Sequence, residues 1–576
     1  MRLHTRLRFA PAEVEVDKRA DGATLLRSPQ ALKPYARAVG DWLVHWHERA
    51  PDRTFLAERK GEGWRRVSYR DALSDARRIG QALLDLGLGP ERPVAILSDN
   101  SVDHALLALG AMHAGVPVAP ISPAYSLMSK DFAKLKYIFE LLNPGLVFAE
   151  QAEKFAPALA AVGAASTPVA RLLETNPGST LEVAFSRLAP DTVAKILFTS
   201  GSTGIPKGVI NTHRMLTSNQ QSWAQLWPFL EDRPQVLCEW LPWNHTFGGN
   251  ATFNMVLRNG GTLYIDGGKP APGLVEITAK NLREISPTLY FNVPRGFDLL
   301  MPMLEQDAAL RHSFFRDLDM VFYAGAALPQ NLWERLEKLA LAEKGGNLAM
   351  LSAWGSTETA PMASCVHYPI ERAGVVGNPA PGCELKLLPS GGKLEIRVKG
   401  PNVTPGYHRS DELTRAAFDE EGYYRIGDAM KLADPAAPEK GLVFDGRVAE
   451  DFKLTTGTWV HVGAIRVKLI AAGNPIIQDA VIAGHDRNEV GALVFLSPAA
   501  PKDPAEIRAK LVATLKELVN ESGSSTHPVR LLVMTEPPQI DAGEITDKGY
   551  INQRAVLERR AALVERLYSG APEVVT

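Results

Sequence analysis

Predicted helices and predicted strands alternate along much of the chain, and this alternation limits the possible fold more than any other feature of the sequence. Amphipathic spacing predicts a helix over 69–86, and an apolar stretch predicts a second helix over 105–114. Short buried strands are predicted on either side of the second helix, at 93–97 and 116–120. Such alternation is typical of layered α/β domains. We therefore expect an α/β fold.

The chain is too long for one hydrophobic core, because 576 residues exceed the size at which a single core stops growing. A polar turn rich in proline at 434–439 precedes the predicted domain boundary near Val448. We expect a large layered α/β domain over 1–447 and a small α+β domain over 448–576. Residues 1–36 are expected to form an irregular leader.

The charge balance argues against a nucleic acid or an anionic membrane as partner. The chain has 63 basic and 65 acidic residues and a formal net charge of -2, without a basic excess on the scale of a domain. Its three cysteines, Cys238, Cys365 and Cys383, are widely spaced and fit neither a disulfide framework nor a zinc site. A run of about 18 apolar residues is absent from the sequence, and the basic N-terminus lacks the apolar region of a signal peptide. We expect a cytoplasmic protein without a membrane span.

Segment 198–208 has the highest density of groups that bind anions. It holds three glycines, four hydroxyl residues and one lysine in eleven positions, between an apolar run and a β-branched run. Glycines let backbone N–H groups approach an anion closely, and the hydroxyls and the lysine add donors and charge. The segment predicts a phosphate-binding loop between two strands, although ordinary loops use the same residue types. Its predicted phosphate ligands are Thr199, Ser200, Gly201, Ser202, Thr203, Gly204 and Lys207.

The segment is not a P-loop of the form G-x-x-x-x-G-K-[ST]. Pro206 precedes the lysine where the P-loop has glycine, and Gly208 follows it where the P-loop has serine or threonine. The residues after Gly208 also favour a strand, whereas a P-loop opens a helix. The segment resembles instead the phosphate loop of the adenylate-forming superfamily, which includes acyl-CoA synthetases, aryl-CoA ligases, luciferases and peptide-synthetase adenylation domains.

This resemblance extends over nearly the whole chain and implies the organisation of the superfamily. It implies a large domain that binds ATP and a carboxylic acid, a hinge at 448–451 and a small mobile domain. The expected fold is accordingly α/β, with a large layered N-terminal domain joined by a hinge to a small α+β C-terminal domain. ATP, Mg²⁺ and coenzyme A are the implied cofactors and co-substrates. Thr203 and Lys207 are implied to take part in catalysis.

Two further segments follow predicted strands and correspond to the acid-binding and adenine-binding parts of the superfamily. His245 lies among aromatic residues and glycines, where a structural histidine is at least as frequent as a functional one. The resemblance implies that His245 gates and lines the acid pocket and counts among the catalytic residues, with Phe247 as a second wall residue. A turn of small residues implies that Gly325, Ala326 and Ala327 line the adenine and acid pocket, although tight helix–strand packing also explains small residues there.

Residues 348–359 run from a strand through an aromatic residue to a glycine and a Thr-Glu pair. A carboxylate is a natural ligand for the Mg²⁺ that accompanies a triphosphate, and an aromatic ring can stack on a purine. The alternative is a helix start, but the segment does not complete a capping box. The resemblance implies that Glu358 binds Mg²⁺ and that Thr357 binds phosphate. It also assigns Trp354 and Gly355 to the nucleotide, and Gly355 to the acid as well, although the superfamily has tyrosine where Trp354 stands.

A Gly-Asp pair near the end of the large domain would ordinarily be a turn. Here it lies in 424–428, which matches the superfamily's Y-R-[TS]-G-D motif except for isoleucine in place of the hydroxyl residue. The match implies that Asp428 accepts hydrogen bonds from the ribose hydroxyls. Arg447 resembles the arginine that contacts ribose or phosphate, and Lys453 is a further predicted cofactor-binding residue beyond the hinge.

The small domain departs from the superfamily at the lysine that holds the carboxylate and the α-phosphate during adenylation. Glu544 stands at the aligned position, and Lys548 is the nearby substitute. A cation there would bridge two negative groups, and one charge-assisted contact in a dry site lowers a barrier by about 3 kcal/mol. We therefore expect Lys548 to be catalytic, the alternative being an ordinary surface lysine. The runs 456–460 and 543–552 resemble the feruloyl-CoA synthetase branch of the superfamily.

The resemblance implies a two-step ligase. ATP with Mg²⁺ and an acid of the feruloyl or hydroxycinnamoyl type would give an acyl-adenylate and pyrophosphate, and CoA would then take the acyl group as a thioester and release AMP. Two alternatives stay open: a medium- or long-chain fatty acyl-CoA synthetase, and a degenerate protein that holds acyl-adenylate without turnover, which Glu544 favours. The expected partners are the small-molecule acid, ATP and CoA, and the expected assembly is a monomer or homodimer.

Overall fold

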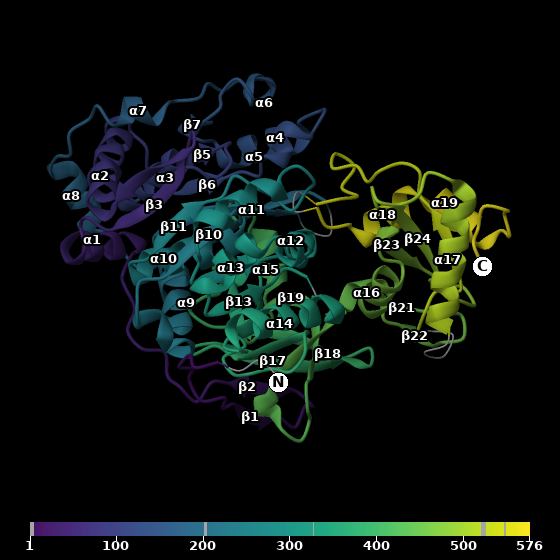
Figure 1. The fold of residues 1–576 in the computed structure, drawn as a ribbon. Coiled ribbons are helices and arrows are strands. Elements are labelled where there is room, and N and C mark those ends of the chain that lie inside the picture. Colours follow the sequence, from purple (N-terminus) through teal and green to yellow (C-terminus); the bar gives the residue numbers. More distant parts are fainter. Residues whose placement is uncertain (1–4, 201–203, 327, 520–525, 547–548) are drawn as a thin grey trace.

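The computed structural model describes residues 5–200, 204–326, 328–519, 526–546 and 549–576. The chain forms two lobes of unequal size, which Figure 1 shows with the larger lobe in purple to green and the smaller lobe in yellow-green. Within the described residues the larger lobe holds three sheets and the smaller lobe two. The expected α/β fold, with a large N-terminal and a small C-terminal domain, is therefore confirmed.

The largest sheet combines a parallel part with an antiparallel part. Three neighbouring strands at one edge are parallel, whereas the other neighbouring pairs are antiparallel. Among the described residues it has eleven strands, in the order β1 (Glu15–Lys18), β2 (Thr24–Arg27), β17 (Glu384–Ser390), β18 (Lys393–Lys399), β19 (Tyr424–Leu432), β20 (Leu442–Arg447), β16 (Val375–Pro379), β15 (Met362–Cys365), β14 (Ala349–Gly355), β13 (Met320–Tyr323) and β12 (Leu289–Asn292).

Four helices cover the parallel part of this sheet and bury one cluster of aromatic and aliphatic side chains against it. Their bounds are α11 (Val275–Glu284), α12 (Pro294–Gln306), α13 (Ala308–Arg316) and α14 (Gln330–Lys344).

Two further sheets complete the larger lobe, and one core cluster joins residues of both. The first carries the predicted phosphate loop, in the order β7 (Leu146–Phe148), β5 (Val94–Ile96), β6 (Val118–Pro120), β8 (Val193–Ser200) and β9 (Pro206–Thr212). The second has the order β10 (Val236–Glu239), β11 (Thr262–Ile265), β3 (Thr54–Lys60) and β4 (Gly63–Ser68). The helices of this region are α1 (Val39–Arg49), α2 (Tyr69–Asp85), α3 (Val102–His113), α4 (Ala124–Leu127), α5 (Ala133–Leu142), α6 (Ala156–Ala161), α7 (Val169–Leu172), α8 (Ser179–Ser186), α9 (His213–Leu226) and α10 (Phe253–Asn259).

Helix α2 illustrates why these residues form the predicted helices. Ser68 precedes the helix, and its side-chain oxygen accepts a hydrogen bond from the backbone N–H of Asp71, which satisfies one of the free donors at the helix start. Leu73 and Ala76 lie three residues apart and are buried on one face. The helix predicted over 69–86 is thereby confirmed.

The smaller lobe begins after a 3₁₀ turn at Val448–Glu450 and has its own apolar cores. Its strands form a two-stranded sheet, β21 (Phe452–Lys453) with β22 (Trp459–Val460), and a three-stranded sheet, β23 (Ile477–Ala483), β24 (Gly491–Leu496) and β25 (Arg530–Val533). Its helices are α16 (Val462–Ala472), α17 (Pro504–Val519), α18 (Gln553–Arg559) and α19 (Ala561–Tyr568), and α15 (Asp411–Ala417) lies in the larger lobe before them. Across the described ranges, helices long and apolar enough to cross a membrane are absent.

The segment predicted as an irregular leader, 1–36, contains two strands in its described part, 5–36, and is irregular over most of the rest of that part. β1 and β2 form a hairpin that extends the largest sheet, and β2 pairs with β17, with Arg27 opposite Glu384. Leu25 and Leu26 of β2 are buried, whereas all of β1 is exposed. The strand that pairs with β2 lies far along the chain, and strand formation depends on such neighbours, so local sequence does not indicate it.

Candidate active site

Several strands of the larger lobe end at the same place. β12, β13 and β14 run parallel, and β10 lies beside β12 through a hydrogen bond from the backbone N–H of Thr288 to the carbonyl of Val236 (2.8 Å). Ligands of α/β proteins bind at the carboxyl ends of such strands. Two predicted site residues, His245 and Gly325, lie in the segments that follow β10 and β13, and a third, Gly355, is the last residue of β14.

The phosphate segment has the predicted strand–loop–strand form. β8 and β9 pair antiparallel, with Thr199 opposite Lys207. Gly204 takes a left-handed backbone conformation with φ of 76°, which favours glycine. Phosphate binding by this hairpin stays a prediction. Three of its predicted ligands lie outside the described residues: Gly201, Ser202 and Thr203.

Tyr407 connects the phosphate hairpin to the predicted metal ligand. Its hydroxyl donates a hydrogen bond to Oε1 of Glu358 (3.1 Å), and the ammonium of Lys207 lies 5.4 Å from the centroid of its ring. The backbone N–H of Thr404 donates to the carbonyl of Glu358 (2.8 Å) and fixes the backbone of that residue. The structure thus brings the predicted phosphate-binding lysine and the predicted metal-binding carboxylate together on one tyrosine.

The surroundings of Glu358 fit the Mg²⁺ that the resemblance implies. Glu358 and Thr357 are buried side by side in a short 3₁₀ turn after β14. Magnesium at nucleotide sites takes one or two protein carboxylates, and the phosphates and waters supply its other ligands. Groups of three or more metal-ligating side chains are absent from the described residues, so a metal here would depend on the nucleotide. Glu358 is the residue that would hold it.

Asp428 and Trp354 are hydrogen-bonded to each other, which the sequence did not predict. Oδ2 of Asp428 accepts from Nε1 of Trp354 (2.8 Å), and Nε of Arg447 lies 3.5 Å from Oδ1. Within the described residues Oδ1 is buried and receives no hydrogen bond. Burial raises the pKa of Asp428, while the charge of Arg447 and the Trp354 hydrogen bond oppose the shift. A buried oxygen without a donor fits the predicted contact to ribose, and stacking of Trp354 on adenine stays a prediction.

His245 and Phe247 lie in the turn that leads from β10 into a π-helix (Phe247–Thr252). The backbone N–H of Phe247 donates to Nδ1 of His245 (3.2 Å). Because Nδ1 accepts this bond, the proton of the neutral imidazole lies on Nε2. The ring of Phe247 lies 5.8 Å from that of Phe322 in β13 and 6.3 Å from that of Phe291 in β12. Aromatic side chains therefore lie behind the strand ends where the acid is predicted to bind.

Gly325 and Gly355 differ in what surrounds them. A Cβ on Gly355 would lie 1.7 Å from the carbonyl oxygen of Pro361, so packing within the chain already requires glycine there. Gly325 is exposed to the space between the lobes, with φ of 86°. Of the other predicted residues in this turn, Ala326 is exposed and Ala327 lies outside the described residues.

Lys453 is not brought to the other predicted site residues. It is exposed on β21, and its ammonium lies 5.0 Å from the centroid of the Trp459 ring. Trp459 packs against Gly391, in the turn between β17 and β18. The hairpin that carries Lys453 thus meets the larger lobe at the turn between β17 and β18, and the predicted role of Lys453 in cofactor binding stays a prediction.

Glu544 is buried and paired. Its carboxylate accepts hydrogen bonds from Nε and Nη2 of Arg560 (2.7 and 2.8 Å) and from the backbone N–H of Gln539 (3.0 Å), and Nη1 of Arg559 lies 2.9 Å away. Burial opposes ionisation, but these contacts outweigh it and lower the pKa of Glu544. These ion pairs give the glutamate at the predicted lysine position a structural role, which explains its presence without a degenerate site. Lys548 lies outside the described residues, and its catalytic role stays a prediction.

Sequence reasoning missed three residues of this region: Tyr407, Lys195 and Tyr550. Lys195 had a signal, because it interrupts the apolar run before the phosphate loop. It is buried in β8, and its ammonium donates to the carbonyl of Gly249 (2.7 Å) and to Oδ1 of Asn250 (3.3 Å) in the π-helix. Tyr407 and Tyr550 each follow a glycine in a loop, a pattern too common to single them out.

The class of protein that this fold and site define is a nucleotide-binding α/β enzyme with two lobes. The family described as AMP-binding enzyme matches residues 43–408, and the AMP-binding enzyme C-terminal domain matches residues 454–572. The chain therefore belongs to the AMP-binding enzymes. The resemblance to the adenylate-forming superfamily is confirmed.

Curated relatives include several CoA ligases. Malonate–CoA ligase of Arabidopsis thaliana is 25% identical over 382 residues, which cover 62% of this chain and 60% of the relative. Long-chain-fatty-acid–CoA ligase FadD15 of Mycobacterium bovis is 24% identical over 611 aligned positions, which cover 92% of this chain and 96% of the relative. The chain spans only about three fifths of the length of the first of these relatives.

Two solved structures show the same fold. O-succinylbenzoate Coenzyme A synthetase (MenE) of Bacillus subtilis, in complex with AMP, matches with a TM-score of 0.68 and 18% identity over 90% of this chain and 98% of its own. The anthranilate CoA ligase AuaEII, in complex with anthranoyl-AMP, matches with a TM-score of 0.74 and 19% identity over 93% of this chain and 99% of its own.

Proposed function

We propose that the protein is an ATP-dependent acid–CoA ligase that activates an aromatic carboxylate of the feruloyl or hydroxycinnamoyl type. A carboxylate oxygen of the acid attacks the α-phosphorus of ATP, and pyrophosphate leaves. The thiolate of CoA then attacks the acyl carbon of the adenylate, so that AMP leaves and a thioester forms. Relatives named as acid–CoA ligases, and a similar structure that holds an acyl-adenylate, support this reaction class.

The observation that carries the proposal is a chain of side-chain contacts from the phosphate hairpin to the strand that bears the predicted ribose acceptor. Lys207 lies over Tyr407, whose hydroxyl donates to Glu358 and lies 3.3 Å from the hydroxyl of Tyr424. Tyr424 begins β19, the strand that also carries Asp428. These groups follow the order of the parts of ATP with its metal ion: a cation for the phosphates, a carboxylate for the metal ion and a hydrogen-bond acceptor for the ribose. Mg²⁺, held by Glu358, would offset the charge of the triphosphate.

We further propose that the acid substrate is aromatic. The rings of Phe247, Phe291 and Phe322 pack near the strand ends, and a flat acid fits such surroundings in offset or edge-to-face geometry. The likeness of 456–460 and 543–552 to feruloyl-CoA synthetases supports the same class. A long-chain fatty acid is the second candidate, because the fatty-acid ligase FadD15 matches over 92% of this chain.

The release of AMP from ATP and Mg²⁺ tests the proposal, measured with ferulate, octanoate or malonate and with or without CoA. We expect turnover that requires CoA and prefers ferulate. A preference for octanoate or malonate would keep the ligase reaction and reject the aromatic acid. The absence of AMP with all three acids would contradict the proposed function.

A further inference from the structure

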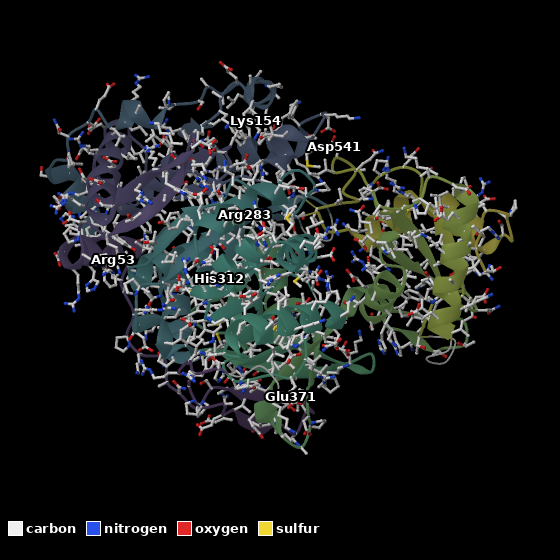
Figure 2. The ribbon with its side chains drawn as sticks, viewed as in Figure 1. Arg53, Lys154, Arg283, His312, Glu371 and Asp541 are labelled. Atoms are coloured by element: carbon white, nitrogen blue, oxygen red, sulfur yellow. The ribbon has the colours of Figure 1, made fainter. Side chains whose placement is uncertain are left out.

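A segment of the small domain is docked onto the large domain beside the phosphate hairpin. The carboxylate of Asp541 accepts hydrogen bonds from the hydroxyl of Ser129 (2.6 Å) and the backbone N–H of Lys130 (2.9 Å), and the ammonium of Lys134 donates to the carbonyl of Ile540 (2.6 Å). Figure 2 shows Asp541 at the junction of the two lobes. The side chain of Ile540 is buried in the core cluster of the five-stranded sheet. Both polar and apolar contacts therefore fix where this segment lies.

The same segment closes on itself and holds Tyr550 in place. The backbone N–H of Thr546 donates to the carbonyl of Tyr550 (2.8 Å), and the backbone N–H of Tyr550 donates to the hydroxyl of Thr546 (3.1 Å). Ile545 and Ile551 form an antiparallel bridge next to this pair. Glu544 ties the segment to the small domain through its arginine partners. The backbone of Tyr550 is thus fixed from both sides.

The Tyr550 side chain reaches the strand ends of the large domain. Its hydroxyl oxygen lies 2.8 Å from the position that a Cβ on Gly325 would occupy, in the turn after β13, and Val293 after β12 lies 3.7 Å from the same position. Gly543 of the same segment faces Gly204 of the phosphate hairpin, with 3.8 Å between its would-be Cβ and the Cα of Gly204. The segment therefore faces both the predicted phosphate site and the predicted acid site.

The Tyr550 hydroxyl has no hydrogen-bond acceptor among the described residues. In the described part of the chain it forms no hydrogen bond, although burial raises the pKa of Tyr550 and keeps the hydroxyl protonated at neutral pH. A partly buried donor in a site costs desolvation free energy unless a ligand supplies an acceptor. The acceptor that acid activation would bring to the end of β13 is a carboxylate oxygen.

We propose that Tyr550 is a substrate-contacting residue which the small domain supplies, and that its hydroxyl donates a hydrogen bond to one carboxylate oxygen of the acid beside Gly325. The inference rests on the proposed function. The other carboxylate oxygen attacks the α-phosphorus, the bond from that phosphorus to the bridging oxygen breaks, and pyrophosphate leaves with the electron pair. Tyr550 keeps its proton throughout and orients the acid. A neutral donor can do this without adding charge between the acid and Lys207.

Tyr550→Phe is the matched variant, because it keeps the buried ring and removes only the hydroxyl. We expect the catalytic efficiency kcat/KM for the acid in ATP–pyrophosphate exchange to fall by about tenfold to a hundredfold, as for loss of a hydrogen bond to a charged group. The KM for ATP should stay unchanged. Tyr568→Phe is the control, since the Tyr568 hydroxyl donates to the carbonyl of Glu489 within the small domain (3.1 Å), and its exchange should match the wild type.

The outcomes separate this inference from the proposed function. Wild-type protein that shows no exchange with ferulate, octanoate or malonate would contradict the proposed function. Wild-type exchange that Tyr550→Phe leaves unchanged would overturn the role of Tyr550 alone. Calorimetric titration with AMP and with a non-reacting feruloyl-sulfamoyl adenosine gives a second measurement: the variant should bind the acyl analogue about tenfold more weakly than the wild type does and AMP equally well.

Gly325→Ala tests the geometry independently. The methyl group of the alanine would meet the Tyr550 oxygen. The backbone at position 325 has a φ of 86°, so the alanine also adds backbone strain, and it does so in both the wild type and Tyr550→Phe. Exchange should therefore fall further when Gly325→Ala is made in the wild type than when it is made in Tyr550→Phe, which lacks that oxygen. Equal losses in the two backgrounds would contradict the contact between Tyr550 and Gly325.

Discussion

Glu544 stands where the adenylate-forming superfamily has a lysine, and its partners explain why a carboxylate is kept there. Two arginine side chains and one backbone N–H surround it. A buried carboxylate with this many donors stays ionised and fixes the segment that carries Asp541 and Tyr550. The contacts that Glu544 makes within the described residues hold this loop to the small domain.

Restoring the superfamily's lysine should destabilise the protein. In Glu544→Lys an ammonium would face Arg559 and Arg560 without a counter-charge, and removing one partner of a buried ion pair costs about 3–5 kcal/mol. Glu544→Gln keeps the volume and should lower the free energy of unfolding by less. Urea unfolding of the three proteins measures the difference. Equal stability of Glu544→Lys and the wild type would contradict the structural role of Glu544.

Asp428→Asn should weaken nucleotide binding. The variant keeps the shape of the side chain and the contact with Trp354 but removes the charge that the ribose hydroxyls would meet at Oδ1. We expect the Kd for AMP, measured by calorimetry, to rise by about tenfold to a hundredfold. Asp434→Asn, in the exposed turn before β20, is the control and should bind AMP as the wild type does. An unchanged Kd in Asp428→Asn would remove this residue from the nucleotide site.

At the scale of the elements, a buried set of hydrogen bonds holds the centre of the π-helix Phe247–Thr252 to the strands beside it. We call this set the Lys195 brace. Lys195 in β8 donates to Gly249 and Asn250, and Asn250 in turn donates to Asn211 in β9 (2.9 Å). The widened turn that carries Phe247 is therefore tied to the same two strands that carry the phosphate loop. π-Helical turns often occur at functional sites, because the inserted residue shifts the side chains around it.

Because Lys195 is buried in this brace, we expect the free energy of unfolding to depend on pH. Burial lowers the pKa of Lys195 from 10.5 to about 7, so between these values the unfolded chain binds a proton that the folded chain does not. The free energy of unfolding should therefore rise with pH in this window by about 1.4 kcal/mol per unit from this residue alone, and Lys195→Met should lack that increase. Urea unfolding at several pH values from 7 to 10 measures the slope. Lys154→Met, which removes an exposed lysine, should keep the wild-type slope.

Sequence reasoning succeeded where a local pattern determines an element and failed where a distant partner does. Residues 69–86 contain both the cap and the apolar face of α2, and the phosphate hairpin follows from an apolar run, a glycine-rich loop and a β-branched run. By contrast, β2 forms a strand because it pairs with β17, and the Trp354 side chain is positioned by its hydrogen bond to Asp428. Such pairs become visible only when the chain is folded. The motif residues themselves came from the resemblance, and their contacts came from the structure.

At the scale of the whole molecule, the docked segment is one of the places where the two lobes meet, and the packing of Trp459 against Gly391 is another. Ser129 and Lys130 hold Asp541, Lys134 holds Ile540, and the segment between the lobes carries Tyr550 to Gly325. If the small domain turns about the predicted hinge after the first step, these contacts must break. They stabilise the arrangement in which Tyr550 lies beside Gly325.

Ser129→Ala should slow ATP–pyrophosphate exchange about three- to tenfold, and Asp541→Ala at least as much, because Asp541→Ala loses the bond from Ser129 and also the bond from the backbone N–H of Lys130. The double variant should be little slower than Asp541→Ala alone, because the Ser129 bond is already lost in that variant. Formation of the thioester from supplied acyl-adenylate and CoA should proceed at the wild-type rate in all three proteins. Losses that multiply in the double variant would show that the two residues act separately.

The hairpin of β1 and β2 has a consequence for self-association. β2 pairs with the first four residues of β17, Glu384 to Leu387, and β1 pairs with the other edge of β2. The four residues of β1 are an acid, a valine, an acid and a lysine, and all are exposed. Proteolytic loss of this hairpin would leave β17 as a long open edge with Leu385 and Leu387 behind it. Open edges of this kind pair with the edges of neighbouring molecules, so clipped protein would be drawn into aggregates even though every residue of the active site is intact.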